Sequence, residues 1–276
     1  MSLASEASHA ADLPPPALRR WTRQRIIGHI AMAVWIALGA GLAVFLATSW
    51  NPDLVVRYGP AYLSGLRVTM ILVFVSIALG AILSLPLAFA RMSENPVIAW
   101  PAYGYVYFFR GTPLLAQTFL VYYGLGSFRP QLEAVGLWVF FREAWYCAIL
   151  AFTLNTAAYQ AEILRGAIQS VPRGQLEGAA SLGLRKWVTF RKIVAPQALI
   201  VALRPYGNEI ILMIKGSAIV AIITVYDLMG ETRRAFSRTF DFQTYIWAAI
   251  IYLVLVEVLR ISVDRIERRI TRHLRR

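Results

Sequence analysis

The sequence predicts an all-α integral membrane protein, because charged residues are scarce and uncharged runs are long. Only 16% of the 276 residues are charged and 58% are hydrophobic, whereas soluble domains carry about 25% charged residues. Residues 30–48, 68–90 and 144–161 contain no charged side chain. A helix needs about 20 apolar residues to cross the bilayer core, so each run has the length of a membrane span or comes close to it.

Six membrane spans are predicted from the alternation of apolar runs with charged or polar segments. The third span is interrupted at residues 110–113, and the fifth is the least apolar. Residues 1–26 contain three consecutive prolines and four arginines, and they are predicted to form a disordered basic tail. The predicted spans are about 27–48, 64–90, 99–124, 144–165, 197–225 and 243–262.

The distribution of basic residues predicts the orientation of the chain in the membrane. The net charge is +13, and Lys and Arg concentrate in the tail, in residues 166–196 and after residue 259. Membrane proteins concentrate such residues in cytoplasmic segments. We therefore predict a multi-pass protein of a bacterial inner membrane, with both termini and residues 166–196 in the cytoplasm. The lipid bilayer accounts for the charge without a nucleic-acid partner.

The sequence shows no motif for catalysis or for metal binding. It lacks a GxxxxGK[ST] phosphate loop, a His/Cys cluster with metal-ligand spacing and a nucleophile elbow. We therefore expect a transport subunit that is not itself an enzyme and that binds no metal or cofactor. The energy for transport would then come from another subunit or from an ion gradient.

The polar segment SVPRGQLEGAASLGLRKW, residues 170–187, predicts a short cytoplasmic helix near residues 172–184. Ser170 is a candidate N-cap, and Pro172 is tolerated in a first turn. Small residues allow close approach of another subunit, although each glycine costs about 1 kcal/mol relative to alanine. An ordinary cytoplasmic loop with interfacial helices is the alternative. The face that is predicted to be small consists of Leu176, Ala179, Ala180 and Gly183.

Several stretches, in the right order, resemble the permease subunits of ABC importers. GQLEGAASLGLRKWVTFRKIVAPQAL (174–199) resembles the EAA motif of that family, and three other stretches resemble its polar amino acid branch. The pair Asn208–Glu209 resembles the pattern found in permeases for histidine, for lysine, arginine and ornithine, and for opines. The likeness covers about residues 61–270. The three other stretches are FFRGTPLLAQTFLVYYGLG (108–126), TLNTAAYQAEILRGAIQSVPRGQ (153–175) and NEIILMIKGSAIVAIITVYDL (208–228).

The chain departs from the family pattern in two places. Glu177–Gly178–Ala179 stands where the family has Glu-Ala-Ala, and glycine keeps the surface small while it loosens the helix. The family core typically has five spans, so the span at 27–48 is an addition. The resemblance implies that residues 61–270 form the transmembrane domain of a type I ABC importer.

The resemblance also implies the function and the partners. The chain would import a polar amino acid or an opine-like derivative by alternating access. Its partners would be two ATPase subunits, which use ATP and Mg, a periplasmic binding protein, and either a sister permease or a second copy of the chain. Residues 172–184 would be the coupling helix that docks on an ATPase. The residues expected at that contact are Arg173, Gly174, Glu177, Gly178, Ala179, Ala180 and Gly183.

Polar side chains in the fourth and fifth spans predict a substrate pathway, because ionisable groups at membrane depth usually face a cavity or a partner. Glu162 is a candidate to bind an α-amino group or a cationic side chain, and Lys215 to bind a carboxylate. Alternatively, Glu162 pairs with Arg165 and Glu209 pairs with Lys215. The candidate pathway residues are Asn155, Tyr159, Glu162, Asn208, Glu209 and Lys215.

The interruption of the third span predicts a gate or a bend. Pro and Gly at membrane depth require buried backbone or a water-lined cavity. A simple helix kink, with the arginine reaching toward an interface, is equally consistent with the sequence. The residues concerned are Arg110, Gly111, Thr112 and Pro113.

Two other functions are compatible with a multi-span chain. A gradient-driven amino acid transporter or channel would show inverted repeats and buried acidic pairs, and neither is visible in the sequence. A purely structural membrane subunit has no need of the charged residues in the fifth span.

Overall fold

The computed structural model of the chain describes residues 22–48 and 50–274, and it separates into two units, Met1–Asn51 and Pro52–Arg276. Helix α2 (Arg23–Thr48) is the only helix described in the first unit, and no described side chain in it is buried. The span predicted at 27–48 is therefore helical but begins earlier. Residues 23–26, predicted as disordered tail, belong to α2, whereas 1–21 lie outside the described residues.

The second unit is built from helices, and no strand occurs in any part of the chain that the structure describes. The prediction of an all-α fold is confirmed. The elements in order are α3 (Pro52–Arg91), α4 (Pro96–Gly111), α5 (Leu114–Phe119), a π-helical turn (Leu120–Gly124), α6 (Arg129–Ala134), α7 (Trp138–Phe141), α8 (Ala144–Gln169), α9 (Arg173–Ser181), α10 (Lys186–Thr189), a second π-helical turn (Phe190–Val194), α11 (Ala195–Ser217), a 3-10 helix (Ala218–Ile223), α12 (Leu228–Thr239), α13 (Gln243–Ile270) and a terminal 3-10 turn (Thr271–Leu274).

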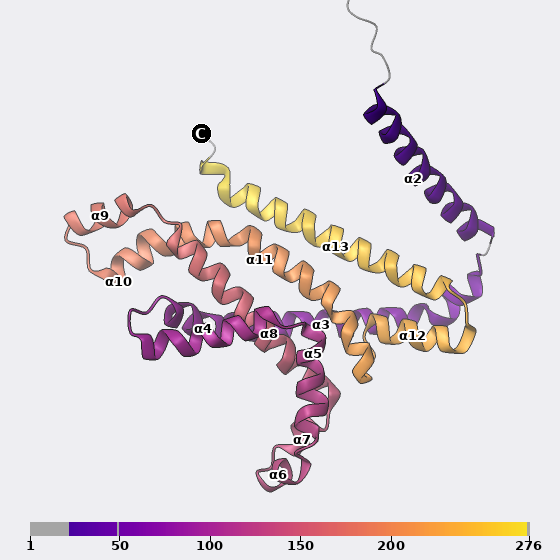
Figure 1. Cartoon of the computed structure of the whole chain (residues 1–276), viewed down its shortest axis with the longest axis horizontal. Coiled ribbons are helices and arrows are strands. Elements are labelled where there is room, and N and C mark those ends of the chain that lie inside the picture. The colour runs from indigo at the N-terminus through magenta and orange to yellow at the C-terminus, as the bar shows by residue number, and fades with distance from the viewer. Residues whose placement is uncertain (1–21, 49, 275–276) are drawn as a thin grey trace, which may run out of the picture. The chain divides into compact units, whose positions relative to one another are not determined.

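Helices α3 and α8 form the centre of the second unit, and α4, α5 and α11 pack around them (Figure 1). The contact between α3 and α8 is close because small residues line it. A Cβ atom at Gly80 would lie 2.5 Å from Cγ2 of Thr156 and 2.9 Å from Nε2 of Gln160. Phe152 of α8 and Ile214 of α11 are fully buried in the adjoining hydrophobic core. Small residues of this kind allow helices in a membrane to approach closely.

Helix α12 is tied to the core by a buried aspartate at its N-terminus. Oδ1 of Asp227 accepts a hydrogen bond from the Gly230 N–H at 2.8 Å, which caps the helix. Oγ1 of Thr69 in α3 accepts a second bond from the Leu228 N–H at 3.1 Å. The backbone of α3 approaches closely at Gly65, where a Cβ would lie 2.8 Å from the Asp227 carbonyl oxygen. The sequence reasoning did not predict α12.

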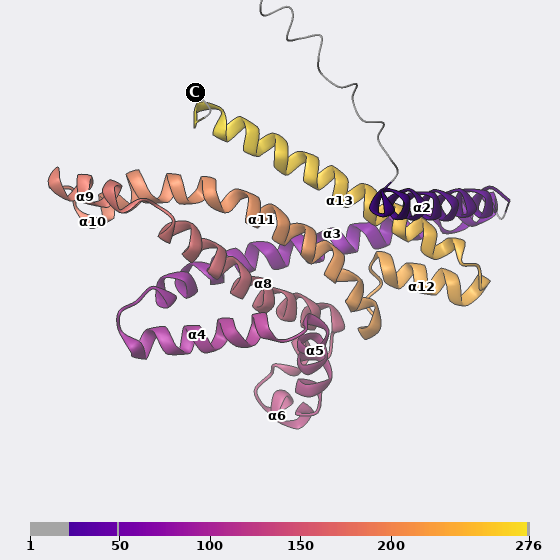
Figure 2. The ribbon, with the colours of Figure 1, turned by 45° about the horizontal axis from the view of Figure 1, so that its top comes forward.

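Two opposite ends of the second unit can be distinguished in Figures 1 and 2. Helices α9 and α10, the turn between α3 and α4, and the final turns of α13 lie at one end, called the α9 end below. Helix α12 and the first turns of α3 and α13 lie at the other end. The segments that were predicted to be cytoplasmic in the second unit thus share one end.

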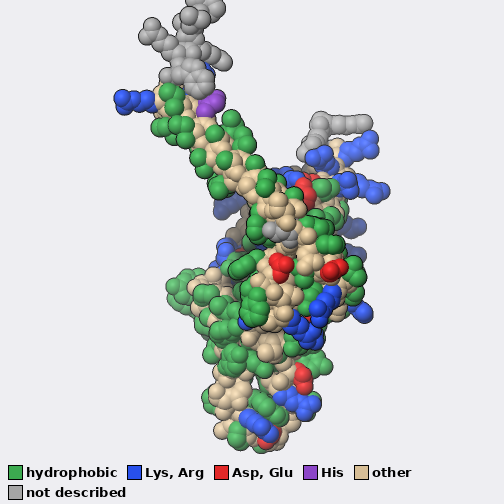
Figure 3. Space-filling model, turned by 90° about the vertical axis from the view of Figure 1, so that its right-hand side faces the viewer, with side chains coloured by type: hydrophobic (Ala, Val, Ile, Leu, Met, Phe, Trp, Pro, Cys, Tyr) green, Lys and Arg blue, Asp and Glu red, His purple; other side chains and the backbone are tan. Residues whose placement is uncertain are grey.

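Four helices of the described chain are long and apolar enough to cross a membrane: 23–45, 52–91, 186–223 and 243–270. Hydrophobic side chains cover much of the face in Figure 3, as expected for helices that contact lipid. The predicted count of six spans stays a prediction.

The boundaries of the predicted spans differ from those of the helices. Helix α3 begins at Pro52 rather than at 64, and the fifth span is continuous with a helix that begins at Lys186 rather than at 197. Helix α13 continues to Ile270, beyond the predicted end at 262.

Candidate functional site

Helix α9 is the predicted short helix at the α9 end, but its caps differ from the expectation. Ser170 does not cap its N-terminus; the Ser170 Oγ donates to the Ala167 carbonyl at the end of α8. Gly183 follows the helix with a φ of 66°, where L-residues are strained. The Gly183 N–H donates to the Ala180 carbonyl and the Leu184 N–H to the Ala179 carbonyl, at 2.9 and 3.1 Å. These two bonds form a Schellman cap, so the assignment of Gly183 to the face of the helix is wrong.

Of the small face predicted for α9, only Ala179 is buried against the rest of the chain, and Leu176, Ala180 and Gly183 are exposed. Ala179 has 2% of its surface exposed, so in this structure it packs against its own chain and presents almost no surface to a partner. Leu176 and Ala180 line a cavity of about 330 Å³ together with residues of α10 and of the following π-helical turn.

The opposite face of α9 is open. A Cβ atom at Gly174 or at Gly178 would meet nothing within 4 Å, and Glu177 and Ser181 share this face at helical spacing. Arg173 is exposed at the start of the helix. The face formed by Gly174, Glu177, Gly178 and Ser181 is called the glycine face below.

The predicted interruption of the third span is a break between two helices. Helix α4 ends at Gly111, Thr112 is extended, and Pro113 precedes α5. Gln117, which is 3% exposed, satisfies the backbone that the break leaves unpaired. Its Nε2 donates to the Phe109 carbonyl at 2.9 Å and to the Thr112 carbonyl at 3.0 Å. The bend is thus stabilised by a buried amide, as non-helical backbone at membrane depth requires.

The polar stripe predicted on α8 lies along this break. Nδ2 of Asn155 donates to the Phe109 carbonyl at 3.1 Å and to Oε1 of Gln117 at 2.9 Å. The Tyr159 hydroxyl lies 3.4 Å from the Arg110 carbonyl. Asn155 is 6% exposed, and its side chain supports the break rather than facing open space.

Glu162, the last member of the stripe, lies among three arginines from three helices. Its nearest contacts are to Arg165 on its own helix at 2.8 Å and to Arg91 at the end of α3 at 3.1 Å. Arg110 at the end of α4 lies 3.7 Å away. The expected alternative, a pair with Arg165, is therefore present, and two further cations join it. The carboxylate lines a cavity of about 480 Å³, which we call the arginine cavity: Arg91, Tyr103, Val106, Tyr107, Arg110, Gly111, Tyr159 and Glu162.

The candidate residues of α11 lie on two different sides of the helix. Glu209 is 5% exposed, and its Oε1 accepts a hydrogen bond from Oγ1 of Thr156 at 2.9 Å. Asn208 and Lys215 are exposed on another face. None of the ion pairs within residues 22–48 and 50–274 joins Glu209 to Lys215, so that expected alternative is wrong in this structure.

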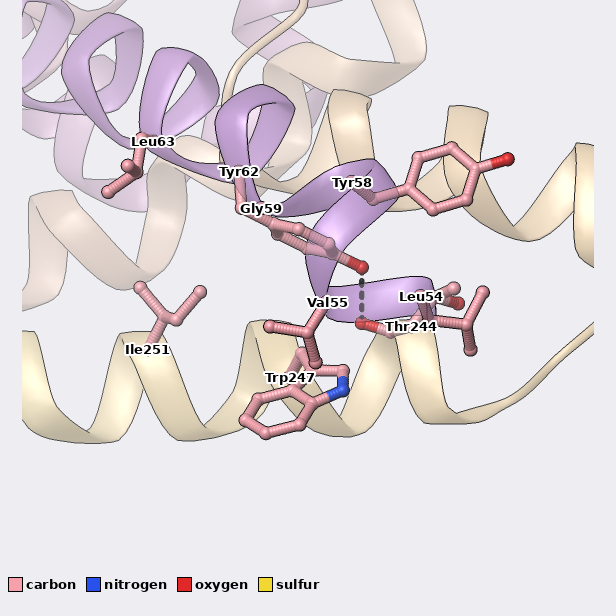
Figure 4. A pocket seen from close by; sticks show the side chains of 9 residues that line it. All are labelled: Leu54, Val55, Tyr58, Gly59, Tyr62, Leu63, Thr244, Trp247 and Ile251. Atoms are coloured by element: carbon pink, nitrogen blue, oxygen red, sulfur yellow. Dashed lines mark hydrogen bonds between the residues drawn. The ribbon is translucent and has the colours of Figure 1, made fainter. Parts of the chain in front are cut away.

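A further cavity of about 230 Å³ lies between the first turns of α3 and α13 (Figure 4). Its walls are apolar and aromatic, with Val55, Leu63 and Trp247 among them. The Tyr62 hydroxyl donates to the Thr244 carbonyl at 2.8 Å. This cavity has no carboxylate, lysine or arginine in its lining, so it offers no charged partner for a zwitterionic or charged substrate.

Two residues of the site were missed by the sequence reasoning. Arg91 was not among the predicted site residues, yet it contacts Glu162. Gln117 lies in a largely apolar run, four residues after Pro113. An amide side chain in such a run, so close to a predicted helix break, is the sequence signal that could have identified it.

Comparison with known proteins identifies the family. Residues 76–272 match the family described as binding-protein-dependent transport system inner membrane component. The chain is 44% identical over 207 residues to the nopaline transport system permease protein of Agrobacterium fabrum, covering 75% of this chain and 86% of that protein. It is 38% identical over 213 residues to the histidine/lysine/arginine/ornithine transport system permease protein of Escherichia coli K12, covering 77% of this chain and 90% of that protein.

The structural comparison agrees. A crystal structure of an amino acid ABC transporter with histidines matches with a TM-score of 0.70 and 36% identity, covering 78% of this chain and 96% of that one. An inward-facing methionine ABC transporter shares the fold, with a TM-score of 0.64 and 19% identity. The chain belongs to the family of binding-protein-dependent transport system inner membrane components, and the expectation of an ABC-type importer permease is confirmed.

Proposed function

We propose that the chain is the permease subunit of an ATP-driven importer that moves a polar amino acid or an opine-like derivative across a bacterial inner membrane by alternating access. The observation that carries the proposal is the family match, which runs from the middle of α3 to the terminal 3-10 turn. The named relatives transport nopaline in one case and histidine, lysine, arginine and ornithine in another. A periplasmic binding protein delivers the substrate in this proposal.

The energy enters through α9, where the glycine face meets one of two ATPase subunits that use ATP and Mg. A helix with bare backbone on its exposed side permits close contact with a groove. Arg173 and Glu177 supply polar contacts at the rim, and the buried Ala179 holds α9 to its own chain. A second permease, either a sister protein or a second copy of this chain, completes the pathway. The α9 end and both termini are cytoplasmic in this arrangement.

Motion of α9 reaches the pathway through two connections. Only a few residues separate α9 from α8, which carries the stripe along the α4–α5 break. On its other side, a short loop leads to α10, which continues through a π-helical turn into α11. A displacement of α9 therefore moves Glu162 on one helix and Glu209 on the other, as near-rigid elements do in domain transitions. The break at residues 110–113 is the bend that accommodates this motion.

Transport by the reconstituted complex tests the proposal. The chain is purified from its host with its associated ATPase and binding protein and is reconstituted in proteoliposomes. Uptake of radiolabelled histidine, lysine, octopine and nopaline is then measured. We expect uptake of at least one substrate that requires hydrolysable ATP and persists when an ionophore collapses ion gradients. Uptake abolished by the ionophore alone would instead identify a gradient-driven transporter, and a lack of uptake would favour a structural subunit.

A further inference from the structure

The arginine cavity holds more positive charge than its one carboxylate balances. Arg165 alone engages both oxygens of Glu162: Nε lies 3.0 Å from Oε1 and 3.2 Å from Oε2, and Nη2 lies 2.8 Å from Oε2. Its Nη1 donates to Oε1 of Gln169 at 2.7 Å. Arg165 therefore balances the charge of Glu162 in a bidentate pair, which is the strongest geometry for such a contact.

Arg91 and Arg110 are the surplus cations. Arg91 donates one Nε–H to Glu162 at 3.1 Å, and its guanidinium lies 4.8 Å from the ring centre of Tyr103. Arg110 is beyond hydrogen-bond distance of Glu162 at 3.7 Å, and 43% of its side chain is exposed. Neither forms an ion pair with another carboxylate in the described part of the chain, although the buried Glu209 attracts Arg110 electrostatically. A guanidinium has five N–H donors, so both arginines keep donors for another acceptor.

Such a cavity favours a negatively charged ligand. Unbalanced cations in a partly buried site are costly and seek an anionic partner or water. The planar fork of a guanidinium matches the geometry of a carboxylate. The cavity volume of about 480 Å³ lies within the range of about 300–1,000 Å³ typical of small-molecule sites. Three tyrosines in its walls, Tyr103, Tyr107 and Tyr159, supply aromatic surface and hydroxyl groups.

We propose that the arginine cavity binds carboxylates of the transported molecule, and that Arg91 and Arg110 select substrates with more than one carboxylate. Opines, in which the nitrogen of an amino acid carries the carbon skeleton of an oxo acid, have at least two carboxylates. Lysine and histidine have one carboxylate each, so neither can engage both surplus arginines through carboxylates. The inference rests on the proposed function and narrows its substrate class from polar amino acids to opine-like conjugates.

The test compares octopine and lysine as substrates of the same complex. Labelled octopine, nopaline, histidine and lysine are supplied to proteoliposomes that hold the ATPase and one binding-protein preparation, so that only the permease differs. We expect ATP-dependent uptake of octopine or nopaline by the unaltered chain. Arg91→Gln and Arg110→Gln each raise the KM for that opine about tenfold or more, as the loss of a charged hydrogen bond predicts. The ratio of opine uptake to lysine uptake should fall in both variants.

Two control variants separate binding from structure. Arg142→Gln removes an exposed arginine that pairs with Glu143 outside the cavity, and the uptake ratio should not change. Arg91→Lys keeps the charge but loses the fork, and it should restore part of the opine preference.

The outcomes distinguish this inference from the function on which it rests. If no labelled compound is taken up in an ATP-dependent manner, both fail. If the unaltered chain transports lysine or histidine but no opine, or if Arg91→Gln and Arg110→Gln lower all uptake rates equally, only the carboxylate selectivity is refuted.

Discussion

Glycines serve opposite purposes in the centre of the second unit and in α9. At Gly80 and Gly65, the missing side chain makes room for another part of the same chain, with neighbouring atoms at 2.5 and 2.8 Å from an added Cβ. At Gly174 and Gly178, an added Cβ would meet nothing within 4 Å. The first pair is explained by packing within the chain. The second pair costs helix stability without any contact that the chain itself provides.

The difference separates contacts that the chain provides by itself from a surface that, in the proposed function, meets a partner. Gly80 packs against α8 and Gly65 against the start of α12, so the packing of the chain explains both glycines. The glycine face has no such explanation within residues 52–274, and the proposed ATPase groove supplies one. Substitutions at the two kinds of glycine should therefore separate folding from assembly.

The largest effect is expected for Gly80→Leu. The new side chain collides with Thr156 and Gln160 on α8, and overpacking of this kind costs about 1–3 kcal/mol or more. We expect loss of folded protein in detergent, measured by size-exclusion profile and thermal melting. A variant that melts at the temperature of the unaltered chain would show that α3 and α8 are not packed as described.

An intermediate effect is expected for Gly178→Trp. The indole points away from the chain, so the purified permease should fold and melt normally. Co-purification of the ATPase should fall about tenfold or more, which corresponds to about 1.4 kcal/mol of binding free energy. Gly126→Trp is the matched control, because an added Cβ there also meets nothing within 4 Å and the site is distant in sequence from α9. Undiminished ATPase recovery with Gly178→Trp would refute docking through the glycine face.

Gly183→Trp would be a poorer probe of the same contact. Gly183 has a positive φ and caps the helix, so any side chain there strains the backbone. A loss of ATPase in that variant would have two explanations.

The smallest effect is expected for Gly178→Ala. Alanine favours a helix over glycine by about 1 kcal/mol, and its methyl group has free space in the chain. The melting temperature of the permease should rise slightly or stay constant, while ATPase recovery and uptake remain within about twofold of the unaltered chain. A strong loss of uptake would mean that the partner surface requires bare backbone at this position.

The sequence predicted the features that depend on local pattern. Uncharged runs located the long helices, and Gly111 with Pro113 located the break between α4 and α5. The short helix α9 was found from its flanking proline and its polar composition.

Features that depend on tertiary contacts were not predictable in this way. Spacing alone assigned Ala179 to an outward face, whereas packing buries it. It also placed Gly183 in the helix, whereas the Schellman cap ends α9 at Ser181. Arg91 and Glu162 are far apart in the chain, so no local signal linked them. Helix α12 was missed although its N-cap, Asp227, is a local signal, whereas its hydrogen bond to Thr69 of α3 has no such signal.

The unbroken run of helix from Lys186 to Ser217 has a mechanical consequence. At 1.5 Å per residue, the path along this helix is roughly 45–50 Å, with one end beside α9 and the buried Glu209 in its inner half. In the proposed mechanism this helix works as a lever: a small rotation at one end becomes a large displacement at the other. The π-helical turn at Phe190–Val194 lies near the α9 end of the lever. The stiffness of this turn would determine how much of a displacement of α9 is transmitted to the part of the helix that carries Glu209.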